Sequence, residues 1–74
     1  MNVYKVQITS TEGDQECYHL IGWASAGNEY IAIKALGFEN ATLNKYLGLN
    51  ERGKDVWTYN AGNAVNCLVR VTRV

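Results

Sequence analysis

Apolar and polar residues alternate along the first segment of the chain. In residues 3–9, Tyr4, Val6 and Ile8 fall on one face, and mostly polar side chains fall on the other. This period of two predicts a β-strand with one face against a core and the other in solvent.

A second strand is expected at residues 16–24, joined to the first by a tight turn that contains glycine. The register that brings the two apolar faces together places Val6 opposite Ile21 and Tyr4 opposite Trp23. It predicts that Trp23 lies in the core, where a large aromatic ring would pack against the start of the following helix.

The segment 25–38 has a clear helical signature. Ser25 suits the N-cap position, and Gly37 suits the left-handed residue that ends a helix. Glu29 near the start and Lys34 near the end match the helix dipole. A sheet must cover the apolar stripe opposite Lys34, because a helix of about three turns is only marginally stable alone.

The second half of the chain predicts a short helix and two further strands. Residues 39–48 carry two leucines four positions apart, which favours one or two helical turns, and a charged loop follows at 49–55. Strands are expected at 56–59 and 64–74. The sequence therefore predicts an α+β fold, with a four-stranded antiparallel sheet in ββαββ order and one main helix plus the short second helix packed on one face. The residues expected in the core are Tyr4, Val6, Ile8, Ile21, Trp23, Ala32, Ile33, Leu36, Val65, Cys67, Val69 and Val71.

The composition is that of one small globular domain, residues 1–74. Hydrophobic residues make up 47% of the chain, and seven basic residues balance seven acidic ones. A protein that binds duplex DNA through many phosphates usually has a basic excess, so the neutral balance argues against nucleic acid as the partner. Without a signal peptide or an apolar run of membrane length, we expect a complete cytoplasmic protein with reduced thiols and no membrane contact.

Few residues could support catalysis or metal binding. Cys17 and His19 are two apart in one strand and Cys67 could reach the same face, but a closed zinc site needs a fourth ligand. A Cys17–Cys67 disulfide would require an oxidising compartment, and small cysteines that fill core gaps are the simpler explanation. The chain has one histidine, no nucleophile motif and no glycine-rich phosphate loop. We therefore expect no enzyme activity, no cofactor and no metal.

The face of the predicted sheet away from the helix is the candidate binding surface. It carries more apolar side chains than an open antiparallel face requires, with basic residues around them. The partner-binding residues expected there are Lys5, Tyr18, Leu20, Val56, Leu68 and Arg70. Three alternatives remain for this face: the 39–55 connection covers it, a second copy covers it in a homodimer, or it binds single-stranded nucleic acid weakly through Lys5, Tyr18 and Arg70.

The helix sequence S-x-x-x-E-Y-x-A-I-x-A-L-G, from Ser25 to Gly37, follows a pair of strands and resembles that of many small phage and mobile-element proteins. Some anti-CRISPR inhibitors are similar in size and in this mixed build. The resemblance implies a non-enzymatic protein-binding module that blocks a host nucleoprotein defence complex by occupying its surface, in the cytoplasm of the host cell. It carries over no functional residues, and the neutral chain departs from the acidic surfaces with which anti-CRISPR proteins often mimic nucleic acid.

Overall fold

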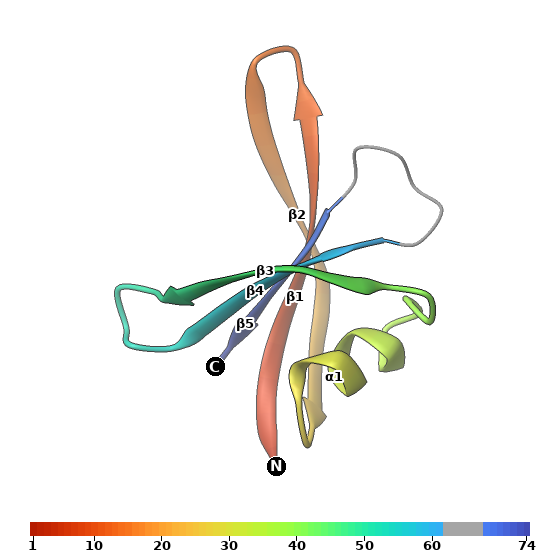
Figure 1. Ribbon diagram of the computed structural model, residues 1–74, viewed down its shortest axis with the longest axis vertical. Coiled ribbons are helices and arrows are strands. Elements are labelled where there is room, and N and C mark those ends of the chain that lie inside the picture. Colours follow the sequence, from red (N-terminus) through yellow and green to blue (C-terminus); the bar gives the residue numbers. More distant parts are fainter. Residues whose placement is uncertain (62–67) are drawn as a thin grey trace.

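The computed structural model describes residues 1–61 and 68–74, apart from the side chains of residues 11 and 12. Within these residues the protein forms a five-stranded antiparallel sheet and one helix (Figure 1). In chain order the elements are β1 (Asn2–Glu12), β2 (Gln15–Ala26), α1 (Glu29–Ala35), β3 (Thr42–Leu49), β4 (Asp55–Asn60) and β5 (Leu68–Arg73). The strand order is β2-β1-β5-β4-β3, which places β5 between the two hairpins.

The predicted ββαββ order with four strands is wrong, because residues 39–48 do not form a second helix. Most of them belong to β3, which pairs with β4. A helix of one or two turns would have little stability of its own, whereas the strand gains a ladder of hydrogen bonds. Register shifts leave extra residues at Asn44 and Leu47, and these β-bulges hide the period of two from the sequence.

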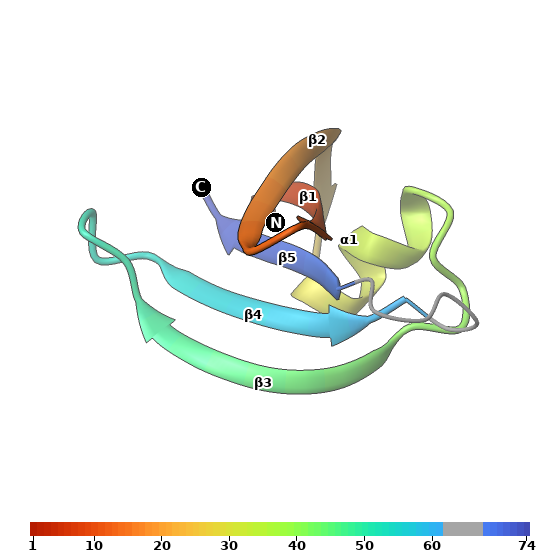
Figure 2. The same ribbon diagram turned by 90° about the horizontal axis from the view of Figure 1, so that it is seen from above.

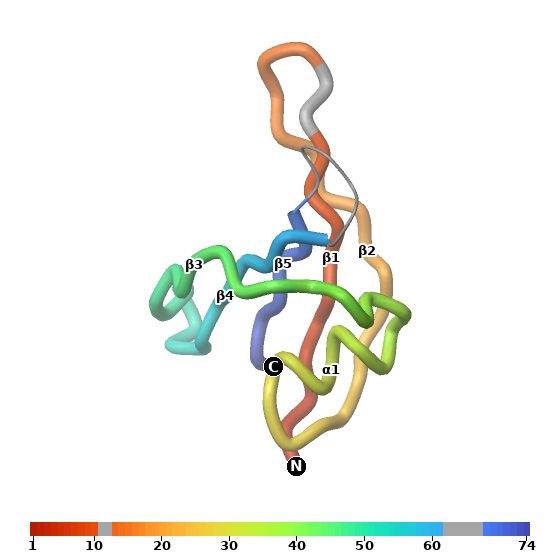
Figure 3. The backbone as a smooth tube through the Cα atoms, turned by 45° about the vertical axis from the view of Figure 1, so that its right-hand side comes forward, coloured from red at the N-terminus to blue at the C-terminus, as the bar shows by residue number. Residues whose placement is uncertain are grey.

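The sheet is strongly curled, so the β3–β4 hairpin runs across the direction of the β1–β2 hairpin (Figure 2). The turn end of the β1–β2 hairpin extends beyond the other strands (Figure 3). β1 pairs with β2 and β5, and β4 pairs with β3 and β5. β2 and β3 are therefore the edges of the sheet.

The helix α1 lies on one face of the sheet, over β2, β1 and β5. Its N-cap is Asn28 rather than Ser25, because the Asn28 Oδ1 accepts a hydrogen bond from the Ile31 N–H at 2.9 Å while Ser25 remains in β2. Gly37 has a φ of +104°, so the left-handed residue expected after the helix is confirmed.

The core lies between α1 and the sheet. Ile33 from the helix and Val6, Val69 and Val71 from the sheet are fully buried. The other buried members of this cluster are Tyr4, Ala26, Ala32, Ala41 and Tyr59. The structure confirms six of the predicted core residues: Tyr4, Val6, Ala32, Ile33, Val69 and Val71. Two more, Ile8 and Leu36, are half-buried. The predictions for Val65 and Cys67 lie outside the described residues.

The core prediction is wrong for Ile21 and Trp23, which are exposed over 40% and 56% of their surface. The cause is a β-bulge in β2. The register is as predicted near the turn, but Val6 pairs with Gly22 instead of Ile21, so Ile21 is an extra residue. Beyond the bulge Trp23 lies opposite Lys5 and points to the face away from α1.

The bulge leaves small residues of β2 beneath the helix. Gly22 and Ala24 lie opposite Val6 and Tyr4 on the helix side. A Cβ atom at Gly22 would lie 3.5 Å from the Leu36 Cδ2 atom, an ordinary van der Waals distance, so the Leu36 side chain packs directly over Gly22. The predicted register would have put Ile21 in the place of Gly22 and Trp23 in the place of Ala24.

Candidate functional site

The far face is the surface of the sheet opposite α1, and three rows of side chains cross it. Paired residues of antiparallel strands lie side by side on one face, so the register assigns the rows. From β2 to β3, the first row is Trp23, Lys5, Thr72, Val56 and Gly48; the second is Leu20, Gln7, Arg70, Thr58 and Lys45; the third is Tyr18, Thr9, Leu68, Asn60 and Thr42. Trp23 is the member that the predicted register had placed on the other face.

All six predicted partner-binding residues lie on the far face, but they differ in accessibility. Tyr18 and Leu20 are exposed, at 44% and 51% of their surface. Leu68 and Arg70 are half-buried beside them. Val56 is only 3% exposed, so it has almost no surface to offer a partner. The sixth residue, Lys5, belongs to a separate hollow described below.

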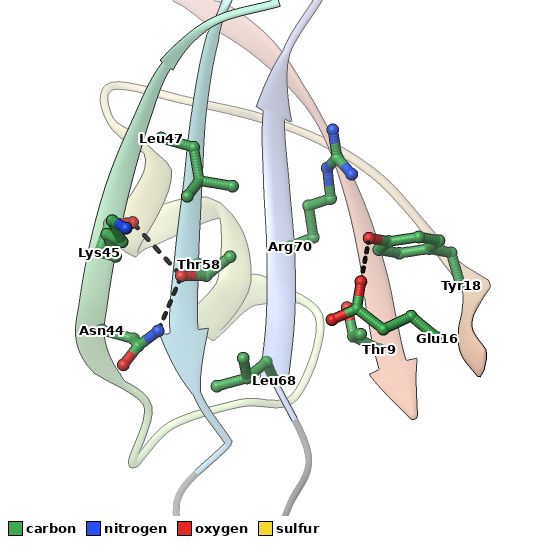
Figure 4. Close-up of a pocket in the computed structure, with 9 residues that line it drawn as sticks. All are labelled: Thr9, Glu16, Tyr18, Asn44, Lys45, Leu47, Thr58, Leu68 and Arg70. Carbon is green, nitrogen blue, oxygen red and sulfur yellow. Dashed lines mark hydrogen bonds between the residues drawn. The ribbon is translucent and has the colours of Figure 1, made fainter. Parts of the chain in front are cut away.

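Two hollows open on the far face within the described residues. The smaller one, the Arg70 hollow, has a volume of about 210 Å³ (Figure 4). It is lined by Thr9, Glu16, Tyr18, Asn44, Lys45, Leu47, Thr58, Leu68 and Arg70. The Arg70 guanidinium lies 5.2 Å from the centre of the Tyr18 ring, and the Tyr18 hydroxyl donates to the Glu16 carboxylate at 2.9 Å. These two contacts hold the Tyr18 ring in place at the edge of the hollow.

Arg70 keeps an unused hydrogen-bond donor. Its Nε atom is buried and has no hydrogen-bond partner among the described residues. A buried N–H group without an acceptor is destabilising, so an acceptor brought by a ligand would be favoured there. Phosphate and carbonyl oxygens are acceptors of this kind.

The larger hollow, the Trp23 basin, has a volume of about 580 Å³. It is lined by Lys5, Trp23, Asn50, Arg52, Lys54, Thr72, Arg73 and Val74, of which four are cationic and none is acidic. Arg73 forms an ion pair with Asp55, whose Oδ2 atom lies 3.0 Å from the Arg73 Nε atom. The sequence did not reveal this basin, because the predicted register buried Trp23.

The turn between β3 and β4 presents Arg52 and Lys54 to the Trp23 basin. The Asn50 Oδ1 atom accepts hydrogen bonds from the backbone N–H groups of Arg52, at 2.9 Å, and Lys54, at 3.0 Å. The Asn50 N–H donates to the Lys54 carbonyl at 2.8 Å, and Gly53 has a φ of +74°. In Figure 2 this turn lies on the same side as the C-terminal end of β5. The side chain of Asn50 thus fixes the backbone that carries two of the four cations.

The balanced charge of the chain hides an uneven distribution. Six of the seven basic residues line the two hollows, and Lys34 on α1 is the exception. Among the acidic side chains that the structure describes, Glu16 alone lines a hollow. The linings of the two hollows are therefore positive overall, and a positive surface concentrates anions near it.

A separate polar cluster joins β3, β4 and β5. The Tyr46 hydroxyl donates to the Asp55 Oδ1 atom at 2.7 Å, and the Arg73 Nε donates to Oδ2. The hydrogen bond from Tyr46, with help from Arg73, lowers the pKa of the Asp55 carboxyl below its usual range. The same hydrogen bond raises the pKa of the Tyr46 phenol. The cluster ties three strands together beside the basin.

Tyr59 links β4 to the helix. Its hydroxyl donates to the Glu29 Oε1 atom at 3.2 Å, and its ring packs in the core. Burial, followed by the nearby Glu29 carboxylate, raises the pKa of Tyr59 to about 12. The phenol therefore stays protonated at neutral pH and serves as a structural donor.

The residues considered for metal binding do not form a site in the described part of the chain. No group of three His, Cys, Asp or Glu side chains lies close enough there to hold a metal ion. Cys17 and His19 share one face of β2, because they pair with Ser10 and Ile8. Cys67, which the zinc and disulfide alternatives both require, lies outside the described residues.

Comparison with known proteins adds no family assignment: no family model matches the chain, and no curated protein or solved structure is significantly similar to it. None of the described segments forms a helix with the length and apolar character needed to cross a bilayer.

Proposed function

We propose that this protein binds single-stranded nucleic acid on the far face of its sheet. The proposal rests on one observation: six of the seven basic residues line two hollows of a face that also exposes Trp23 and Tyr18. Cations bind backbone phosphates, and aromatic rings stack on bases that are not paired. The proposed role is binding, without a chemical step.

The spacing of the aromatic rings favours a single strand over a duplex. Trp23 and Tyr18 lie opposite Lys5 and Thr9, so roughly 13 Å of β-strand separates them. Bases in a duplex are stacked inside the helix and present only their edges. In a single strand, two bases separated by a few nucleotides can turn out and stack on the two rings while the backbone follows the cations between them.

The neutral net charge is compatible with this role. A basic excess is typical of proteins that contact many phosphates of a duplex. A single strand crossing the far face would meet a locally positive surface, because the described acidic residues other than Glu16 line neither hollow. Binding of this kind should be moderate in affinity and sensitive to salt.

Fluorescence anisotropy with a labelled oligothymidylate of about 12 nucleotides tests the proposal, with a duplex of equal length for comparison. We expect the single strand to bind more tightly than the duplex, and its affinity to fall as salt rises. Lys45→Ala removes a charge from the Arg70 hollow and should reduce the slope of log affinity against log salt by about 0.7. Lys34→Ala removes one exposed lysine from the helix side and is the matched control.

Three results would contradict the proposal. The first is no binding to any single strand at low salt. The second is binding that does not depend on salt. The third is an equal loss of affinity in Lys45→Ala and Lys34→Ala, which would show that the positive charge acts without regard to its position on the molecule.

A protein partner is the second candidate, and the edge strand β3 favours it. Leu43, Leu47 and Leu49 of this strand are each exposed over 47% to 64% of their surface. Exposed apolar side chains along an unpaired edge are typical of protein contact sites. The inhibitor of a host nucleoprotein defence complex, suggested by the phage-like helix pattern, belongs to this candidate. Co-elution with a purified complex of this class, abolished by Leu49→Asp, together with absent oligonucleotide binding, would select it over the first.

A further inference from the structure

We infer that the Trp23 basin is a nucleotide subsite, in which a base stacks on the Trp23 ring while its phosphate lies between Lys5 and the cations of the β3–β4 turn. This inference rests on the proposed function and assigns one of the far-face hollows a specific ligand. It accounts for three features of the basin that a general positive surface would not require: an exposed tryptophan, a cationic turn held by hydrogen bonds to Asn50, and a volume suited to one small ligand.

Trp23 provides the stacking surface. More than half of its area is exposed, although it lies in the interior of the pairing between β1 and β2 rather than in a loop. A strand holds its side chains at fixed positions, so the ring is placed before a ligand arrives. Stacking of a base on such a ring is worth roughly 5- to 100-fold in affinity when the ring is removed by substitution.

The cations of the basin are available for an anion. Arg73 is the one member of the four with an ion pair among the described residues, to Asp55. Lys5 lies directly opposite Trp23 in the register, whereas Arg52 and Lys54 come from the turn built around Asn50. A phosphate in the basin would therefore meet positive charge from two sides, on groups whose backbone is already fixed.

The size of the basin fits a nucleotide better than it fits a bare anion. Sites for small organic ligands usually have volumes of about 300–1,000 Å³, and the basin has about 580 Å³. Inorganic phosphate would use the cationic wall and leave the Trp23 wall in water. A nucleoside would use Trp23 and leave the cations without an anion. Only a ligand that combines a planar ring with a phosphate uses both walls.

The fluorescence of Trp23 provides a direct test. The chain contains two tryptophans, and the other, Trp57, packs against Tyr4 and Tyr46. In a Trp57→Phe background we would titrate thymidine 5′-monophosphate, thymidine and inorganic phosphate. We expect the monophosphate to quench the emission at a concentration at least tenfold lower than thymidine does, and phosphate to cause no quenching while it competes with the monophosphate.

Affinity measurements on variants supply the second readout and need no change at Trp57. Trp23→Ala should weaken oligothymidylate binding 5- to 100-fold, and Trp23→Phe should recover part of that loss. The double variant Arg52→Ala/Lys54→Ala should flatten the salt dependence, whereas Lys34→Ala should leave it unchanged. Circular dichroism would establish that each variant keeps the wild-type spectrum.

The outcomes separate the subsite from the proposed function. Salt-dependent oligonucleotide binding with unchanged Trp23 emission and a neutral Trp23→Ala variant would overturn the subsite and leave the function standing. Absent oligonucleotide binding would overturn both. Quenching by a poly-glutamate peptide at the concentration effective for the monophosphate would overturn the nucleotide assignment and identify an acidic protein segment as the occupant.

Discussion

Replacement of Ile33 by alanine should remove a large part of the stability of this fold. Ile33 is fully buried and lies in a helix of seven residues whose buried members are Ala32 and Ile33. The substitution deletes three buried carbons, worth about 2.4 kcal/mol at about 0.8 kcal/mol each. The cavity left behind raises the cost to about 3–4 kcal/mol, within the usual range for isoleucine to alanine.

This cost is large compared with the expected stability of the protein. At roughly 0.05–0.15 kcal/mol per residue, a chain of 74 residues has about 4–11 kcal/mol in total. For domains of this size each kcal/mol lowers the melting temperature by about 4–8 °C. Ile33→Ala should therefore lower it by roughly 12–30 °C and reduce the urea midpoint without changing the m-value.

Ile31→Ala is the matched control, because Ile31 is the same residue type in the same helix but is 50% exposed. Its smaller loss of burial is partly offset by the higher helix propensity of alanine, so the net cost should be below about 1 kcal/mol. Circular dichroism during heating and urea titration measures both variants. Equal shifts for the two variants would refute the placement of α1 on the sheet through Ile33.

Three further predictions concern polar contacts that stabilise the fold. Because the folded-state pKa of Tyr59 is about 12 against an ordinary 10.0, stability should fall by up to about 3 kcal/mol as the pH rises from 10 to 12, and Tyr59→Phe should flatten this loss in melts recorded across that range. The pH dependence that comes from Asp55 has the opposite direction, because folding lowers the pKa of its carboxyl from 3.8. Its stabilising effect is present above 3.8 and is lost as the pH falls through the lower pKa of the folded state. Thermal melts of Asp55→Asn at acid pH should lack this loss. Asn50→Ala removes the acceptor of two backbone hydrogen bonds and should cost about 1–2 kcal/mol in urea unfolding, with Asn44→Ala, whose amide bonds the Thr58 hydroxyl, costing less.

The sequence predicted those elements whose local signals were regular. β1 follows from strict alternation, and the presence of α1 and its C-terminal end follow from apolar spacing and Gly37, whereas its N-cap is Asn28 and not the predicted Ser25. The β2 register failed because one extra residue reverses the facing of every later side chain. A glycine inside a strand pattern is a known sign of a bulge. Gly22 could therefore have indicated the bulge, and with it the placement of Trp23 on the far face.

β3 could not be recognised from period alone. Its two bulges shift the alternation twice within eight residues, and what remains is a pair of leucines at helical spacing. Residues 42–49 form a strand because they pair with β4, and this pairing depends on a segment later in the chain that the local pattern does not reveal. The candidate site was hidden for a similar reason, because the composition records how many charges a protein has and cannot record that Lys5, Arg52 and Lys54 meet at one basin.

The position of β5 has a consequence for how this protein folds. It is the last of the described strands to be synthesised, and yet it supplies the ladder between the β1–β2 and β3–β4 hairpins. Two-stranded hairpins are marginal in water, so neither half is expected to persist by itself as the chain emerges. Tyr4 must also find Arg73 across nearly the whole sequence, a closure that slows folding. We therefore expect the complete sheet to form only after β5 has been synthesised.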